Sequence, residues 1–367
     1  MLKILHIADL HFGLRFQNHP EAQETLIQAR YETLEKLVGM ANEKDTEILA
    51  IAGDLFDKTS MKVSEIQRAV QSINRFEGNV VLVLPGNHDY ITADSSLWDR
   101  FKKEAGDHVL VLDEKEPVDL SEYDLNAIVY PAPCRAKHSA ENTTGWVKDV
   151  EKVSGKIHIG IAHGSIEGES PDFDQRYFPM TKRELEESGV NIWLLGHTHI
   201  TFPDKPGKRD IVFNPGTPEP DGFDCSHEGR AFLHTIDEKK SIQTEILSTG
   251  SYRFLRVERT LNRQSELEKL LEEFKKEEYQ KSVVKLSVSG RLEPELYEKW
   301  LEKRHQIREV VLELKLDDSG LKRKVTEEQI RKEFTEGSFP EQLLSSIPEE
   351  NEDELQMAYE LIREVKG

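Results

Sequence analysis

The stretch EILAIAGD, residues 47–54, joins a run of apolar residues to Gly53 and Asp54. Such a run is typical of a strand that is buried on both faces, and Asp54 stands where that strand ends. Four other apolar runs end in polar residues in the same way: KILHIAD (3–9), NVVLVLPGNHD (79–89), IHIGIAH (157–163) and VNIWLLGH (190–197). Because the ends of neighbouring strands meet at one edge of a sheet, these segments predict one shared polar site.

The polar residues at these strand ends are of the types that bind metal ions. They comprise Asp9, His11, Asp54, Asn87, His163, His197 and His199. In an extended chain residues i and i+2 point to the same side, so the Asp-x-His and His-x-His pairs can each serve one metal. We expect the carboxylate of Asp54 to bridge two metals, and Gly53 to let the backbone turn sharply beside them. Two-metal centres are typical of phosphoester hydrolysis.

The donor atoms of this set are nitrogen and oxygen without thiolates. That combination suits manganese, iron or zinc and disfavours copper(I) or a structural cysteine zinc site. Any one of these short motifs also fits a surface pair or a hydrogen-bonded core residue. Their number, their order and their placement at strand ends favour the metal site.

The bulk composition limits the class of protein. The 367 residues carry a net charge of −20, which argues against a generally basic surface for nucleic acid. The two cysteines, Cys134 and Cys225, make a disulfide framework implausible and fit a reducing cytoplasm. We find no signal peptide and no apolar stretch of membrane-spanning length, so we expect a cytoplasmic protein with no membrane contact.

The chain changes character near Gly250, after which charged residues become denser. Residues 1–250 alternate strand-like and helical patterns, which predicts a layered α/β domain. Its last two strands, GRAFLHTID and SIQTEIL, flank a predicted hairpin turn and make a mixed sheet. Residues 251–322 predict a small α/β domain with strands at 252–260, 282–289 and 309–316 and helices at 265–278 and 293–305. Residues 323–367 predict short helices.

The motif order D-x-H, G-D-x-x-D, G-N-H-D, H and G-H-x-H resembles the calcineurin-like metallophosphoesterase superfamily over residues 1–250. The resemblance implies a four-layer α/β/β/α sandwich of two mixed sheets with metals at the strand ends. It implies that one metal is held by Asp9, His11, Asp54 and His199. It assigns the other metal to Asp54, Asn87, His163 and His197.

Two neighbours of the ligands are candidates for proton transfer. His88 follows Asn87 but is not a ligand in the superfamily pattern, and it is the natural general acid for the leaving oxygen. Asp57 matches the superfamily position that often keeps this histidine protonated and oriented, although a simple turn residue is the alternative. Phosphatases of the superfamily commonly carry arginine after that aspartate, whereas this chain has Lys58.

The segments KILHIADLHFG, GDLFD, LPGNHD and LLGHTHI are similar to those of SbcD-type DNA repair exonucleases, the prokaryotic relatives of the meiotic recombination eleven nuclease. This resemblance implies a manganese-dependent exonuclease and single-strand endonuclease that forms a homodimer. It implies that residues 251–322 cap the nuclease domain and that 323–367 dock on the coiled coil of an SbcC-like ATPase.

Basic residues near the predicted ligands are candidate contacts to DNA, and Arg15 and Lys58 are the best placed in sequence. Acidic residues expected in rim loops, Asp172, Asp174 and Asp221, would repel DNA unless they turn away. Two other functions remain open: a small-molecule or cyclic-nucleotide phosphodiesterase, and a non-catalytic scaffold that keeps the fold. The domain after residue 250 argues against the first, and the intact ligand set with His88 argues against the second.

Overall fold

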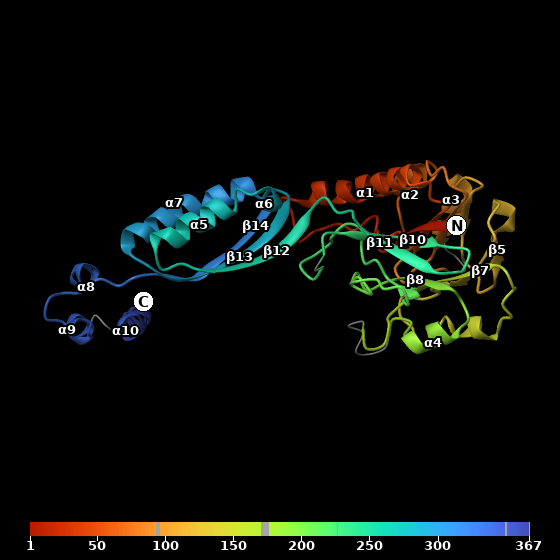
Figure 1. The fold of residues 1–367 in the computed structure, drawn as a ribbon. Coiled ribbons are helices and arrows are strands. Elements are labelled where there is room, and N and C mark those ends of the chain that lie inside the picture. Colours follow the sequence, from red (N-terminus) through yellow and green to blue (C-terminus); the bar gives the residue numbers. More distant parts are fainter. Residues whose placement is uncertain (93–95, 170–175, 226, 349–350, 367) are drawn as a thin grey trace. The chain divides into compact units, whose positions relative to one another are not determined.

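The computed structural model describes residues 1–92, 96–169, 176–225, 227–348 and 351–366 (Figure 1). The chain divides into two compact units, Met1–Phe254 and Leu255–Gly367. In the described part of the chain, no helix has both the length and the apolar character needed to cross a membrane.

The first unit contains two mixed sheets, as predicted. The six-stranded sheet has the order β11-β10-β1-β2-β3-β4. Its strands are β1 (Leu2–Ile7), β2 (Ile48–Ala52), β3 (Val80–Leu84), β4 (Val109–Val111), β10 (Arg230–Ile236) and β11 (Ile242–Ser248). Strands β1 to β4 run parallel, whereas β10 is antiparallel to both β1 and β11. The predicted hairpin between β10 and β11 is confirmed.

The five-stranded sheet has the order β5-β6-β7-β8-β9. Its strands are β5 (Val118–Asp119), β6 (Ala127–Ala132), β7 (Ile157–His163), β8 (Ile192–Gly196) and β9 (Val212–Phe213). Strands β6 to β9 are parallel and β5 is antiparallel to β6. The parallel strands of both sheets therefore deliver their carboxyl ends, where the polar motifs lie, to sheet edges.

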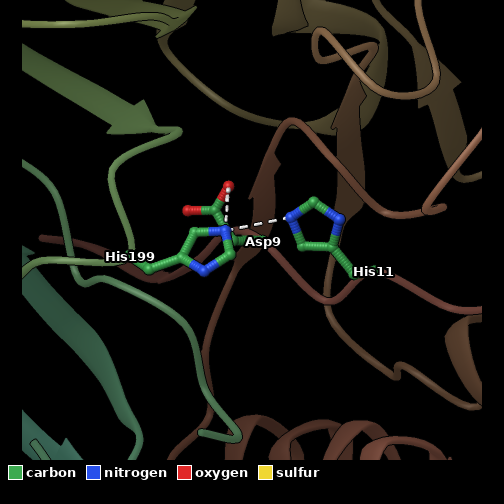
Figure 2. Close-up of side chains that lie close together, drawn as sticks. All are labelled: Asp9, His11 and His199. Carbon is green, nitrogen blue, oxygen red and sulfur yellow. Dashed lines mark hydrogen bonds and ion pairs between the residues drawn. The ribbon is translucent and has the colours of Figure 1, made fainter. Parts of the chain in front are cut away.

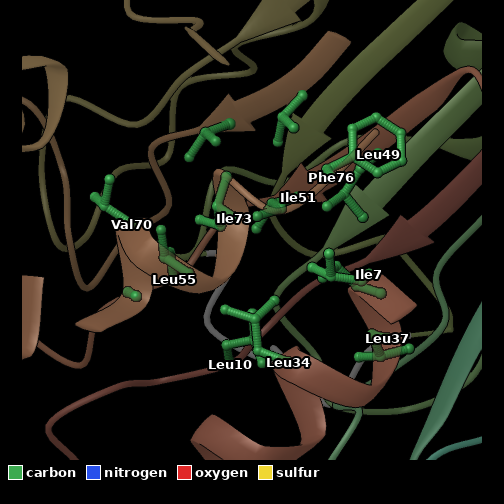
Figure 3. Close-up of a cluster of buried hydrophobic side chains, with 14 of the residues drawn as sticks. Ile7, Leu10, Leu34, Leu37, Leu49, Ile51, Leu55, Val70, Ile73 and Phe76 are labelled. Carbon is green, nitrogen blue, oxygen red and sulfur yellow. The ribbon is translucent and has the colours of Figure 1, made fainter. Parts of the chain in front are cut away.

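Alternating side chains of the buried strands build two cores, one on each face of the larger sheet. In β2, Leu49 and Ile51 pack beneath the helices α1 (Gln23–Glu43), α2 (Val63–Ile73) and α3 (Ser96–Glu104) (Figure 3). Ile48 and Ala50 point the other way and pack between the two sheets. A third core covers the outer face of the five-stranded sheet, where α4 (Lys182–Glu187) contributes Leu185. The predicted four-layer α/β/β/α sandwich is confirmed.

The second unit is built on a three-stranded sheet of order β12-β13-β14. Its elements are β12 (Arg253–Thr260), α5 (Gln264–Glu273), α6 (Glu277–Gln280), β13 (Ser282–Leu292), α7 (Pro294–Val310) and β14 (Glu313–Arg323). The strand expected over 309–316 is present as β14, but it begins later, at Glu313, because α7 continues to Val310 and buries Ile307 in the core. The helix expected over 265–278 is interrupted after Glu273, where the buried ring of Phe274 packs on Tyr279.

The described residues at the end of the chain form the helices α8 (Glu327–Glu333), α9 (Phe339–Ser346) and α10 (Glu352–Lys366), in agreement with the helical pattern. They share a small core that includes Ile330, Phe334, Leu344 and Tyr359. The roles assigned to residues 251–322 as a cap and to 323–367 as a docking segment stay predictions.

Candidate metal centre

Most of the predicted ligands lie on sharp turns rather than on extended backbone, whereas His163 is the last residue of β7. Five of them have positive φ angles: Asp9 (58°), His11 (46°), Asp54 (50°), His197 (111°) and His199 (51°). The expectation that each i, i+2 pair shares one side of an extended strand was therefore wrong. The left-handed conformation costs a residue with a side chain about 1–3 kcal/mol and is concentrated at functional sites. Backbone hydrogen bonds stabilise these turns, including those from Asp9 N to Gly53 O (3.1 Å) and from His11 N to Asp54 O (2.9 Å).

The first ligand group consists of Asp9, His11 and His199, which converge although they come from distant parts of the chain (Figure 2). His199 Nε2 lies 3.0 Å from His11 Nε2 and 3.8 Å from Asp9 Oδ1. The carboxylate of Asp9 is fully buried and accepts the backbone N–H of His197 on both oxygens, at 3.0 Å. The turn that carries His197 and His199 is thereby anchored to the end of β1.

The second ligand group consists of Asn87, His163 and His197. Asn87 Oδ1 lies 2.9 Å from His163 Nε2 and 3.0 Å from His197 Nδ1. Asn87 and His163 are fully buried, and the imidazole of His163 also contacts the carbonyl of Ala52 through Nδ1 at 2.9 Å. That contact fixes the ring so that Nε2 faces the other donors.

Asp54 lies between the two groups. Its Oδ2 is 3.4 Å from His11 Nε2 in the first group and 3.2 Å from His163 Nε2 in the second. Its Oδ1 accepts the backbone N–H of His88 at 2.8 Å. The structure thus brings all seven predicted ligands together, and a single oxygen of Asp54 faces both groups. The bridging role of Asp54 stays a prediction.

The donor set fits divalent metal ions. Nitrogen and oxygen donors lie about 2.0–2.2 Å from zinc-like ions, so neighbouring donors of one ion approach to roughly 3.0–3.6 Å. The separations of 2.9–3.4 Å around His11, Asp54 and His163 are close to this spacing. The described residues therefore hold two groups of converging donors that both face Asp54, and His11, Asp57 and His88 form a third cluster of possible ligands beside them.

The charges within the site favour ionised Asp54. Burial alone would raise the pKa of this carboxyl, but His163 and His11 outweigh it and hold the pKa below its usual range. Burial opposes charge on His163 as well, yet Asp54 raises the pKa of His163 to about 9. Burial and the charge of His163 lower the pKa of His197 to about 3. A metal ion must displace the proton of His163, so metal affinity falls as the pH falls below about 9.

His88 stands beside the ligands without joining either group. Its ring packs edge-on against His11 with centroids 4.8 Å apart, and its side chain is 32% exposed. Its Nδ1 lies 3.0 Å from the backbone carbonyl of Asp57 but 3.9 Å from the Asp57 carboxylate. That carboxylate is nearer to His11 Nδ1, at 3.5 Å. Asp57 therefore contacts His88 through a hydrogen bond to its main chain, and its carboxylate lies at ion-pair distance, where its charge favours the protonated ring.

The predicted DNA contacts have different surroundings. Lys58 is exposed, while the guanidinium of Arg15 lies 3.2 Å from the carboxylate of Glu65, which offsets its charge. Asp172 and Asp174 lie outside the described residues. Asp221 was expected to face the rim, but its carboxylate instead lies 2.8 Å from His199 Nδ1. The rim assignment of Asp221 was wrong, because the loop turns this side chain inward.

Several residues that support the ligands were not predicted from the sequence. Asp89 is buried and accepts the backbone N–H groups of Gly86 (2.6 Å) and Phe56 (3.0 Å), which ties together the two turns beside Asp54. Burial and the charge of Asp54 raise the pKa of Asp89 to about 7. Thr217 Oγ1 donates to the carbonyl of Asp9 at 3.0 Å. Asp89 stands within the Gly-Asn-His-Asp motif, and the run NPGTPEPD (214–221) was the available signal for Thr217 and Asp221.

We expect any substitution of Gly53, even by alanine, to destabilise the protein. Its φ is +92°, and a Cβ atom there would lie 2.0 Å from His163 Nδ1. We expect Gly53→Ala to lower the free energy of unfolding of the metal-free protein by about 1–3 kcal/mol, because it adds strain at a left-handed position and pushes His163 away. Thermal or denaturant unfolding measures this loss.

Gly39 provides the matched control for that substitution. A Cβ there meets nothing within 4 Å, and Gly39 lies within α1. Gly39→Ala should raise the unfolding free energy by about 0.5–1 kcal/mol. Equal stability of the Gly53→Ala and wild-type proteins would contradict the close approach of Gly53 to His163.

The comparisons with known proteins agree with this geometry. A family model described as calcineurin-like phosphoesterase matches residues 2–201. The uncharacterised metallophosphoesterase YhaO of Bacillus subtilis is 25% identical over 207 residues, which cover 54% of this chain and 48% of that protein. The DNA double-strand break repair protein Mre11 of Methanopyrus kandleri is 24% identical over 247 residues, which cover 60% of this chain and 49% of that protein. The chain spans about half the length of the curated relatives it matches.

Two solved structures also align with the chain. A protein from Thermus thermophilus aligns with a TM-score of 0.40 and 14% identity, over 66% of this chain and 98% of that chain. A dimetal phosphatase from Danio rerio aligns with a TM-score of 0.38 and 12% identity, over 68% of this chain and 99% of that chain.

Proposed function

The chain belongs to the calcineurin-like phosphoesterase family, and we propose that it is a two-metal phosphodiesterase that cleaves DNA. The observation that carries the proposal is the position of Asp54 Oδ2, which lies 3.4 Å and 3.2 Å from one histidine of each ligand group. Two ions that share a carboxylate are typical of enzymes that hydrolyse phosphoesters. We propose manganese for both positions, with iron or zinc as alternatives that the same donors accept.

The roles of the residues follow from their contacts. Bound divalent ions would activate water and stabilise the charge on the phosphoryl oxygens. His88 would deliver a proton from Nε2 to the leaving oxygen, because its Nδ1 is engaged by the Asp57 carbonyl and its ring is partly exposed. Burial lowers the pKa of His88 below its usual value, and the nearby charge of Asp54 opposes this shift only in part.

DNA is the substrate that the similarities favour. The Methanopyrus kandleri relative is named as a DNA double-strand break repair protein, and its match covers 60% of this chain. The proposed activity is exonuclease cleavage with single-strand endonuclease cleavage, in the cytoplasm. The net charge of −20 favours a second candidate, a phosphodiesterase for small or cyclic-nucleotide diesters, because extended DNA needs more basic surface.

A substrate panel separates these functions. With Mn²⁺ we expect the protein to cleave single-stranded and hairpin DNA, and chelation should abolish the cleavage. The panel includes cyclic nucleotides, and products are resolved by gel electrophoresis and chromatography. Cleavage of small diesters alone would overturn the DNA assignment, and no cleavage of any substrate would favour the non-catalytic scaffold.

We propose that the last helices dock on an SbcC-like ATPase and that the protein acts as a homodimer. Support for docking comes from the resemblance and from large apolar side chains that are exposed on α9 and α10. These are Phe339 (74%), Met357 (66%), Leu361 (56%) and Val365 (90%). Light scattering measures the dimer, and failure of the full chain to bind a purified SbcC-like ATPase would contradict the docking proposal.

A further inference from the structure

His199 is held from the side opposite the first ligand group. Its Nε2 faces His11, and its Nδ1 lies 2.8 Å from Asp221 Oδ2. The carboxylate of Asp221 can accept the hydrogen on Nδ1, which leaves Nε2 as the nitrogen that a metal ion in the first group would bind. A histidine that binds a metal usually donates its other ring N–H to such a carboxylate or carbonyl, which fixes its tautomer and orientation.

Asp221 is itself held by a buried cation. Arg30 of α1 is 1% exposed, and its Nη2 lies 3.6 Å from Asp221 Oδ2. The same guanidinium donates from Nη1 to the carbonyl of Leu10 at 2.6 Å, between the two ligands of the Asp-x-His motif. Arg30 therefore contacts both the turn that carries Asp9 and His11 and the carboxylate that faces His199.

The backbone of His199 is fixed by a separate contact. His227 Nε2 donates to the carbonyl of His199 at 2.8 Å, and His227 Nδ1 accepts the backbone N–H of Gly229 at 3.1 Å. The main chain of His199 is therefore held independently of Asp221. This separation means that loss of the Asp221 carboxylate frees the imidazole without releasing the turn.

We propose that Asp221, clamped by Arg30, is a positioning residue that orients His199 for metal binding in the first ligand group. The inference rests on the proposed two-metal function. It adds Asp221 to the residues that act in the metal site. Asp221 lies 22 positions after His199 and outside the superfamily motifs. In this proposal Asp221 is not itself a ligand, and it acts through the ring of His199.

Titration of the metal-free protein with Mn²⁺ tests this role without any substrate. Calorimetry should resolve two sites in the wild type. In Asp221→Ala we expect the affinity of one site to fall about 10–100-fold while the other is unchanged, which is the usual effect of losing such a partner. Asp221→Asn keeps an oxygen acceptor but loses the charge, so it should give a smaller loss at the same site.

Two further variants show whether the effect passes through His199. His199→Ala should weaken the same site, and adding Asp221→Ala to it should cause no further loss, because residues that act as one unit are not additive. Asp204→Ala is the matched control, since Asp204 forms an exposed ion pair with Arg230 at 2.9 Å. It should bind both ions as the wild type does.

The outcomes of these titrations distinguish a failure of the proposed role of Asp221 from a failure of the proposed two-metal function. Two wild-type affinities in Asp221→Ala, or additive losses in the double variant, would overturn the role of Asp221 and leave the two-metal function standing. An equal loss at both sites with a lower unfolding temperature of the metal-free protein would show a merely structural role and would also overturn it. A wild-type protein that binds no Mn²⁺, Fe²⁺ or Zn²⁺ would overturn both proposals.

Discussion

Asp54→Ala is expected to empty both metal positions and to abolish turnover. Asp54 is 1% exposed, and its Oδ2 faces one histidine of each ligand group, so no other described residue offers the same shared oxygen. We expect the rate to fall about 10⁴-fold or more, with each tenfold loss corresponding to about 1.36 kcal/mol of barrier. Elemental analysis of the purified variant, with rates on the same preparation, measures both effects.

Asp54→Asn serves as a second variant for that prediction. It keeps an oxygen that can accept the backbone N–H of His88, so the turn at residues 86–89 should stay intact. It loses the charge that two cations would share, so metal content should still fall. Full occupancy of two ions in either variant, with wild-type turnover, would disprove the bridging role.

His88→Ala is expected to separate proton transfer from metal binding. His88 contacts Asp57 and His11 but belongs to neither the first nor the second ligand group, so both ions should remain. Removing a general acid typically lowers a rate about 10²–10⁴-fold. The measurement is turnover on DNA together with metal content of the same sample.

The leaving group provides a sharper test of His88. A nitrophenyl phosphodiester releases a weakly basic oxygen that needs little help from an acid, so His88→Ala should lose far less activity on it than on DNA. His305→Ala, on an exposed part of α7, is the control and should match the wild type on both. Equal losses on the two substrates would assign His88 to another role, and full activity with full occupancy would remove it from catalysis.

The sequence predicted the strands and their polar ends because buried parallel strands carry an unmistakable apolar pattern before the turn. It placed Asp9, Asp54 and His163 correctly for that reason. It did not predict the left-handed turns, since residues other than glycine adopt positive φ in only a few per cent of cases and nothing in the pattern requires it. Asp221 was misplaced because its partner lies across the fold, where only tertiary contacts decide whether a loop carboxylate turns inward.

The errors in the predicted helix and strand boundaries of the second unit have a simpler physical origin. The residues around Val310 suit either a helix or a strand by composition, and the packing of Ile307 against the core decides for the helix. The helix predicted over 265–278 was also wrong for a reason that composition does not reveal. Its pattern predicts one continuous helix, whereas the structure interrupts it where the ring of Phe274 packs on Tyr279.

The left-handed backbone conformation of the ligand-bearing turns affects which substitutions this protein can accept over evolutionary time. Glycine would relieve the backbone cost of about 1–3 kcal/mol at each of these positions, but glycine has no side chain to bind an ion. Asp9, His11, Asp54 and His199 thus carry their side chains on a backbone conformation that is unfavourable for them. Selection for heat resistance alone, with no demand for catalysis, would remove these residues first, and a thermostable descendant of this chain would be expected to have lost its chemistry while keeping its fold.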